Sequence, residues 1–319
     1  MTLNKDHKEV KNMAAGLLAE DTMFSVGERP WHGIGLVVDT APTSAEAIKM
    51  AGLDWTVEKQ PLFTANGNEA KGYFANVRSD TGRVLGVVKD KYKIVQNADS
   101  FNFVDDLMAM SGECKYETAG SLHNGAKTWL LVKMPETNLV GDKVENYLFF
   151  MNSHNGTSGI VAGVSSVRVV CNNTLQFAMN ESEKLQRQWH VTHRGNIEGK
   201  LEEAKASLKL ANAYVEQERK VAMMMAEKKV NEERFFRELF ESWKKTTGED
   251  TVKKIANEIH EIYQNKEDLQ NFKGTAWGLW NAVCDWESNR KSKGTNEKKL
   301  SKFFTGNKLI TLSQEILVA

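Results

Sequence analysis

His32 and His154 are each followed closely by a glycine, where the backbone can come close to a bound ligand. His32 lies in the motif PWHG at 30–33, and His154 lies in SHNG at 153–156. Because glycine has no Cβ, these two turns are candidate ligand-binding turns. A histidine in such a turn can equally hydrogen-bond the backbone around it, and both interpretations stay open.

A second pair of histidines could bind a metal ion. His190 and His193 stand three residues apart, so on a helix they would share a face, and His154 or Asp142 could complete the site. The spacing is equally compatible with a solvated polar pair. We therefore predict no metal and no cofactor, and keep a metal-dependent enzyme that uses His32, His154, His190 and His193 as a third alternative.

No motif of covalent or nucleotide catalysis is present. The chain has neither the Gly-x-Ser-x-Gly motif of a nucleophile elbow nor a Gly-Lys followed by Ser or Thr, so a P-loop is excluded. We name no catalytic residue, and we favour a protein that is not an enzyme.

The stretch SSVRVVCNNTLQFAM, residues 165–179, places polar residues after an apolar run. We expect a strand that ends at Cys171, with Asn172 or Asn173 capping a helix that follows. Arg168 stands between two valines, and its side chain should point to the face of the strand opposite to theirs. On a solvated face it needs no explanation; in a groove its guanidinium could bind a phosphate or carboxylate.

Lysines surround a tyrosine in KDKYK, residues 89–93. We expect Lys89, Lys91 and Lys93 on one side of an extended segment, with Tyr92 between them. This pattern suits contact with a phosphate backbone and stacking on bases. It also suits a solvated edge strand, where lysines prevent aggregation.

The most polarised part of the chain lies between Trp286 and Lys308. It holds seven basic residues against Glu287 and Glu297. The basic residues are Arg290, Lys291, Lys293, Lys298, Lys299, Lys302 and Lys308. Such a segment could neutralise several phosphates, or it could be a solvated basic loop.

The totals limit the class of protein. The 319 residues suggest roughly two domains, and 42 basic against 42 acidic residues predict neither nucleic-acid nor membrane binding by the chain as a whole. No apolar run approaches the roughly 18 residues of a membrane span, and the polar start lacks a secretory signal. We expect a cytoplasmic protein with no membrane partner.

The odd number of distant cysteines indicates reduced thiols.

The fold class follows from periodicity. Short runs rich in aromatic and β-branched residues fill 54–170, and an amphipathic helix at 98–112 interrupts them. We predict an α+β fold, with an antiparallel sheet and a crossing helix in domain 1–190. Domain 191–319 is predicted to be all-helical with a basic loop. A coiled-coil-like apolar stripe over 197–225 predicts a homo-oligomer, unless it packs on its own domain.

Several motifs together resemble a known family. In order, RPWHGIG, SHNGTSG, VRVVCNNTLQFA, GTAWGLWNAVCDW and KFFTGN resemble a phage- and plasmid-encoded family catalogued as a domain of unknown function, number nine-three-two. The resemblance spans about 25–312. Asn155 departs from the family pattern, which has an aspartate after the histidine, and this weakens a metal or acid–base role for that pair. The resemblance implies a mobile-element context without a settled activity.

The leading hypothesis is a phage or plasmid protein that binds nucleic acid in the cytoplasm of a bacterial host. Single-stranded DNA in replication or recombination is the expected ligand, by analogy in outline with single-strand annealing recombinases. Lys89, Lys91, Lys93, Arg168 and the basic residues of 290–308 would contact phosphate, and Tyr92 would stack on bases. The alternative is a factor that binds a host protein through its helical half.

Overall fold

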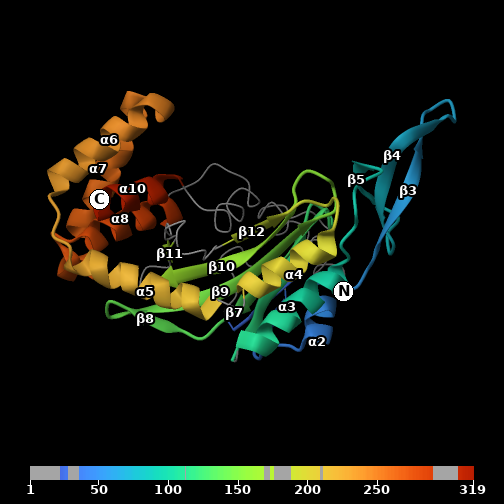
Figure 1. Cartoon of the computed structure of the whole chain (residues 1–319), viewed down its shortest axis with the longest axis horizontal. Helices are drawn as coiled ribbons and strands as arrows, with labels where there is room; N and C mark the ends of the chain where they lie inside the picture. The colour runs from blue at the N-terminus through green and yellow to red at the C-terminus, as the bar shows by residue number, and fades with distance from the viewer. Residues whose placement is uncertain are drawn as a thin grey trace, which may run out of the picture.

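The computed structural model describes residues 22–27, 36–111, 113–168, 173–175, 188–208, 211–289 and 308–319. The fold is α+β, with antiparallel sheets in the N-terminal half and helices in the C-terminal part. In Figure 1 a helical part, a large sheet and a small sheet follow one another along the long axis of the molecule. None of the helices in these ranges is long and apolar enough to cross a membrane.

The large sheet has the strand order β11-β10-β9-β7-β6-β1-β2, with β12 added to β10 and β8 to β9. All its pairs are antiparallel except that of β1 with β2. The strands are β1 (Met23–Val26), β2 (Leu36–Val38), β6 (Lys115–Leu122), β7 (Lys127–Lys133), β8 (Thr137–Leu139), β9 (Asp142–Ser153), β10 (Ile160–Arg168), β11 (Asn173–Leu175) and β12 (Gln188–Val191).

Three helices cover one face of the large sheet: α2 (Ser44–Met50), α3 (Asn97–Ser111) and α4 (Ile197–Leu208) (Figure 1). Successive side chains of a strand point to opposite faces, so alternate residues such as Leu148 and Phe150 meet these helices in one core. Helix α2 begins with the predicted capping box: the Thr43 hydroxyl accepts from the Glu46 amide, and the Glu46 carboxylate accepts from the Thr43 amide at 2.8 Å. The crossing helix α3 is confirmed.

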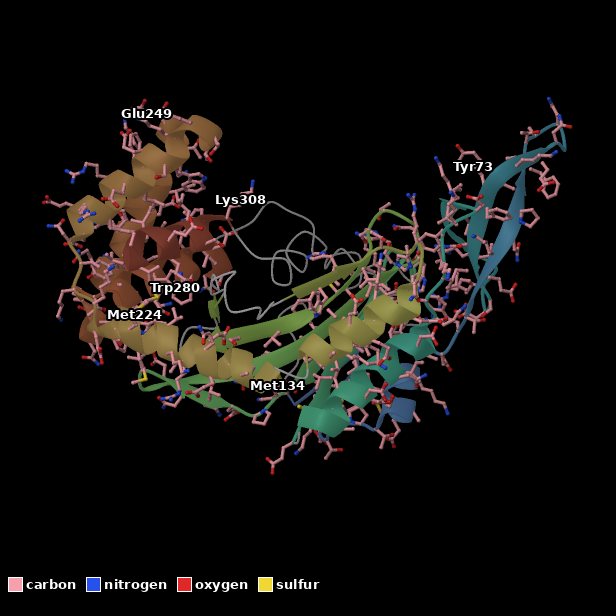
Figure 2. All side chains as sticks on the ribbon, in the orientation of Figure 1. Tyr73, Met134, Met224, Glu249, Trp280 and Lys308 are labelled. Atoms are coloured by element: carbon pink, nitrogen blue, oxygen red, sulfur yellow. The ribbon has the colours of Figure 1, made fainter. Side chains whose placement is uncertain are left out.

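A separate small sheet contains β3 (Val57–Phe63), β4 (Glu69–Arg78) and β5 (Val84–Lys89), all antiparallel. It projects from the body of the molecule in Figure 1. Figure 2 places Tyr73 of this sheet at the opposite end of the molecule from Glu249. The runs in the sequence predicted these strands, but not that they form a sheet of their own.

The helical part consists of α5 (Ala211–Glu227), α6 (Glu232–Thr247), α7 (Glu249–Asn265), the short 3-10 helix η2 (Glu267–Phe272), α8 (Ala276–Asn289) and α10 (Lys308–Val318). Helix α8 lies at its centre, and every residue from Ala276 to Trp286 is buried. Helix α6 begins at the predicted cap, because the Asn231 side chain accepts from the Arg234 amide at 2.9 Å. Gly248 ends it at a φ of 91°, a conformation that favours glycine.

Five residues of the apolar stripe over 197–225 are buried within the chain: Ile197, Ala204, Val215, Ala222 and Met225. Val215 of α5 joins the core under the large sheet, whereas Ala222 and Met225 of the same helix join the core around α8. The two cores therefore meet within α5, and the boundary at 190/191 stays a prediction. These buried residues pack on the chain's own cores, and self-association stays a prediction.

The expected strand-to-helix junction is wrong for residues 173–175. These residues form β11, in which Asn173 pairs with Arg168 across the antiparallel ladder. Asn173 is therefore a strand residue and not the cap of a helix that starts beside it. Asn172 lies outside the described residues.

Candidate nucleic-acid interface

The segment 89–93 is a turn. The Tyr92 amide donates to the Lys89 carbonyl at 3.0 Å directly after β5, and the Asp90 carboxylate accepts from the Lys91 amide at 2.7 Å. The extended conformation predicted for this segment is therefore wrong. The side chains of Lys89, Lys91 and Lys93 are nevertheless all exposed, so three ammonium groups reach solvent within five residues.

Tyr92 has no free ring face to offer. It is buried, and its ring stacks on His193 with centroids 4.5 Å apart and planes 17° apart. Its hydroxyl donates to the Ser153 carbonyl, and burial raises the pKa of the phenol well above its ordinary value. The predicted stacking of Tyr92 on bases is corrected: this ring belongs to the interior.

His193 and Lys59 hold the turn in place. His193 Nδ1 lies 2.9 Å from the Lys93 carbonyl, and the Lys93 amide donates to the His193 carbonyl at 2.8 Å. Since a carbonyl only accepts, Nδ1 carries the proton. The Lys59 ammonium donates to the carbonyls of Asp90 and Tyr92 at 2.7 and 2.8 Å. Lys59 and His193 therefore fix the backbone on which the three exposed lysines stand.

His154 lies in the interior of the protein. Its side chain is fully buried, and Nε2 lies 3.0 Å from Oδ1 of Asn97. The Asn97 amide nitrogen donates to the carbonyls of Leu53 and Trp55 at 3.0 and 3.3 Å, so its oxygen is left to accept from the imidazole. Burial lowers the pKa of His154 to about 3, and the ring is neutral at neutral pH. Among the described residues, its Nδ1 has no hydrogen-bond partner.

The loop after His154 is packed against the small sheet. The His154 carbonyl accepts from the Asn76 side chain at 2.6 Å. The side-chain oxygen of Asn155 accepts from the Ser153 hydroxyl at 2.7 Å and from the Thr157 amide at 3.0 Å, which closes the turn. A Cβ on Gly86 of β5 would lie 2.5 Å from Asn155 Cα, so a larger residue there would push the sheet away. We call Tyr92, Asn97, His154 and His193 the polar junction.

A buried arginine, Arg78, stabilises the same region of the protein. It was not among the residues predicted from the sequence. The Arg78 guanidinium lies 4.4 Å from the ring centre of Trp55 and forms two hydrogen bonds with the Asp80 carboxylate at 2.7 and 2.9 Å. It also donates to the Asn124 carbonyl at 3.1 Å. Arg78 holds the pKa of Asp80 below its usual range. The short spacing of Arg78 and Asp80 in the sequence gave no sign of burial.

The predicted histidine pair diverges. His190 is exposed in the edge strand β12, where it pairs with Val161, whereas His193 is buried in the polar junction. Within the described ranges, no group of three His, Cys, Asp or Glu residues could hold a metal ion. His32, the fourth histidine of the metal-dependent alternative, lies outside those ranges.

The other residues predicted to contact phosphate are Arg168 and the basic residues of 290–308. Arg168 ends β10 and pairs with Val144 and Asn173. Lys308 is exposed at the start of α10. The basic residues Arg290, Lys291, Lys293, Lys298, Lys299 and Lys302 lie outside the described part of the chain.

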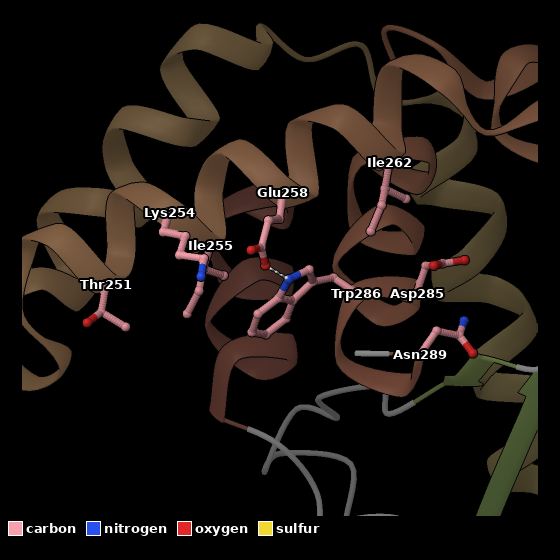
Figure 3. A pocket seen from close by; sticks show the side chains of 8 residues that line it. All are labelled: Thr251, Lys254, Ile255, Glu258, Ile262, Asp285, Trp286 and Asn289. Atoms are coloured by element: carbon pink, nitrogen blue, oxygen red, sulfur yellow. Dashed lines mark hydrogen bonds between the residues drawn. The ribbon is translucent and has the colours of Figure 1, made fainter. Parts of the chain in front are cut away.

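A surface pocket lies in the helical part, between α7 and α8 (Figure 3). Its volume is about 510 Å³. It is lined by Thr251, Lys254, Ile255, Glu258, Ile262, Asp285, Trp286 and Asn289. The Trp286 indole donates to the Glu258 carboxylate at 2.7 Å across it, and Lys266 forms an ion pair with Asp285 beside it.

The comparison with protein families gives one match. Residues 84–304, more than half of the chain, match the family described as Domain of unknown function (DUF932). The chain belongs to this family. No curated protein and no solved structure matches it significantly.

The DUF932 region begins at Val84, the first residue of β5. It therefore contains the turn 89–93, all four residues of the polar junction and the loop 153–157. Strands β3 and β4, with Tyr73, precede it.

Proposed function

We propose that the protein binds nucleic acid, with single-stranded DNA as its ligand. The observation that carries this proposal is the turn 89–93, where three lysines stand exposed on a backbone fixed by Lys59 and His193. Because the backbone of the turn is already fixed, less conformational entropy is lost when these lysines contact a phosphate chain. The basic residues of 290–308 add positive charge in the same chain, whose total charge is zero.

The proposed role is in replication or recombination of a phage or plasmid, in the cytoplasm of a bacterial host. Binding and annealing require no metal, cofactor or nucleophile. This agrees with a polar junction whose histidines are buried and neutral. The proposal also includes self-association of the chain.

Titration with salt tests the proposal. We expect a fluorescently labelled oligothymidylate to bind the full-length chain, with an affinity that falls linearly with salt on logarithmic axes, because bound lysines release condensed counterions. A duplex of the same length is the matched ligand control and should bind more weakly. A variant in which the six basic residues of 290–302 become glutamate should bind with lower affinity and a smaller salt slope.

Two results would contradict the proposal. One is the absence of binding to single-stranded DNA at low salt. The other is binding whose strength does not change between about 50 and 200 mM salt, since contacts with several phosphates would lower the affinity strongly over that range.

A second candidate function is binding to a host protein through the helical half. The observation that favours it is a pair of exposed methionines on α5, Met223 at 44% and Met224 at 46% exposure, since flexible thioethers suit protein-binding surfaces. A pull-down from nuclease-treated host lysate distinguishes the two functions. A stoichiometric protein partner that is lost in the M223S/M224S variant would support the second function.

A further inference from the structure

The small sheet has two different faces, which its register defines. Residues paired across an antiparallel ladder point to the same side, so Tyr73 shares a face with Lys89, and Ala75 shares it with Val87. The other face carries Asn76 and Gly86, which contact the loop that follows His154. The first face is exposed at Tyr73, Val87 and Lys89, although Ala75 between them is buried, and we call it the outer face.

The outer face exposes apolar side chains. Tyr73 is 47% exposed, Val84 55% and Val87 53%. Of the seven large apolar residues that the described part of the chain leaves exposed, four belong to this small sheet, because Phe63 near its tip is 61% exposed as well. Folding alone does not favour so many exposed apolar residues on one three-stranded sheet, and such a concentration is typical of a binding surface.

The charges on this surface favour a polyanion. The segment 57–93 holds seven basic and four acidic residues, and because Arg78 and Asp80 pair with each other, six basic and three acidic residues remain. Lys89 pairs directly with Tyr73, and its ammonium lies 5.9 Å from the centre of the tyrosine ring. From Lys89 the chain continues into the turn with Lys91 and Lys93, so the cations extend from the aromatic ring toward the body.

We propose that the outer face is a platform for the bases of a single-stranded nucleic acid, with Tyr73 stacking on one base and Lys89 contacting the adjoining phosphate. An aromatic ring beside a cation accommodates these two parts of a nucleotide, and every base has a face on which a ring can stack. This inference rests on the proposed function. It assigns to Tyr73 the stacking that the buried Tyr92 cannot provide.

The test compares two labelled probes, an oligothymidylate and an abasic oligomer with the same phosphate backbone. In the full-length chain, Tyr73→Ala should weaken binding to oligothymidylate by about 5- to 150-fold, as expected for the loss of one stacked base. It should leave binding to the abasic probe unchanged, and Tyr73→Phe should restore the affinity. Lys89→Gln should weaken binding to both probes and reduce the salt slope.

Met224→Ala is the matched control, because Met224 is exposed to nearly the same degree at the far end of the molecule (Figure 2). It should change neither affinity. If the unmodified chain binds oligothymidylate and Tyr73→Ala binds it equally well, or loses affinity for both probes alike, the platform is wrong while the proposed function stands. If the unmodified chain binds neither probe, the proposed function itself fails. A chain that is dimeric until Tyr73 and Val87 are replaced would overturn the platform in favour of a second copy as its occupant.

Discussion

The Nε2 atom of His154 lies 3.0 Å from the side-chain oxygen of Asn97, and neither side chain is more than 1% exposed. The contact joins two parts of the chain 57 residues apart. Asn97 begins α3, and His154 follows β9, so the pair fixes the crossing helix to the end of a central strand. The histidine of the SHNG motif is therefore a structural residue at the base of the small sheet.

Replacing Asn97 should destabilise the protein. Asn97→Ala removes three hydrogen bonds and leaves the imidazole N–H and the carbonyls of Leu53 and Trp55 without their partner, at a cost of about 2–4 kcal/mol. Urea denaturation followed by circular dichroism measures this loss. Asn102→Ala, at an exposed position of the same helix, is the control and should differ little from the unmodified chain. An unchanged urea midpoint for Asn97→Ala would show that the junction contributes no stability.

The buried imidazole also makes stability depend on pH. The pKa of His154 is about 3 in the folded chain and 6.5 when exposed, so the unfolded chain binds the additional proton between these values. The contribution is complete above pH 6.5 and is lost as the pH falls, at up to about 1.4 kcal/mol per pH unit. Burial also lowers the pKa of His193, which adds a slope of the same sign.

His154→Gln should therefore flatten the pH dependence of the free energy of unfolding between pH 6.5 and about 5, a range above most carboxyl pKa values. His190→Gln provides the control, because His190 is exposed in β12. Urea melts at several pH values measure both slopes. Equal slopes for the His154 variant and the unmodified chain would mean that the imidazole is hydrated in the folded state.

Local patterns in the sequence predicted the local structure. The Thr43–Glu46 capping box, the Asn231 cap and the apolar face of α3 involve residues within about one turn of a helix, so the sequence contains all that determines them. The α+β class follows in the same way, from runs with the period of a strand followed by runs with the period of a helix.

The incorrect predictions depend on contacts between distant residues. Tyr92 is buried because His193, about a hundred residues later, packs on its ring. Asn173 is a suitable helix cap, but pairing with Arg168 places it in a strand. The outer face was missed because it exists only once β3, β4 and β5 form a sheet of their own. The exposure of Lys89, Lys91 and Lys93 could be predicted because lysine rarely lies in a core.

Replacing Arg78 should lower the free energy of unfolding more than replacing an exposed arginine does. Its guanidinium is stacked on Trp55, paired with Asp80 and only 8% exposed, so Arg78→Ala should lower the free energy of unfolding by about 2–4 kcal/mol. Arg78→Lys should recover only part of the loss, because an ammonium cannot form the paired hydrogen bonds. Arg234→Ala is the matched control, since that arginine pairs with Glu238 on an exposed helix surface. Equal urea midpoints for the two alanine variants would contradict the prediction.

The turn 89–93 should account for a definite share of the salt dependence of DNA binding. Each lysine that contacts a phosphate of a single strand contributes about 0.7 to the logarithmic salt slope, so replacing Lys89, Lys91 and Lys93 by glutamine should reduce that slope by up to about 2. Replacing exposed Lys200, Lys220 and Lys229, which lie on or beside α4 and α5, removes the same charge from another surface and should change the slope little. Fluorescence anisotropy with the labelled oligothymidylate over a salt series compares the two triple variants. If both triple variants reduce the slope equally, binding depends on the net charge of the protein and not on the position of the lysines in the turn 89–93. A reduction confined to the first variant would locate phosphate contact at the end of β5, where the small sheet joins the body of the protein.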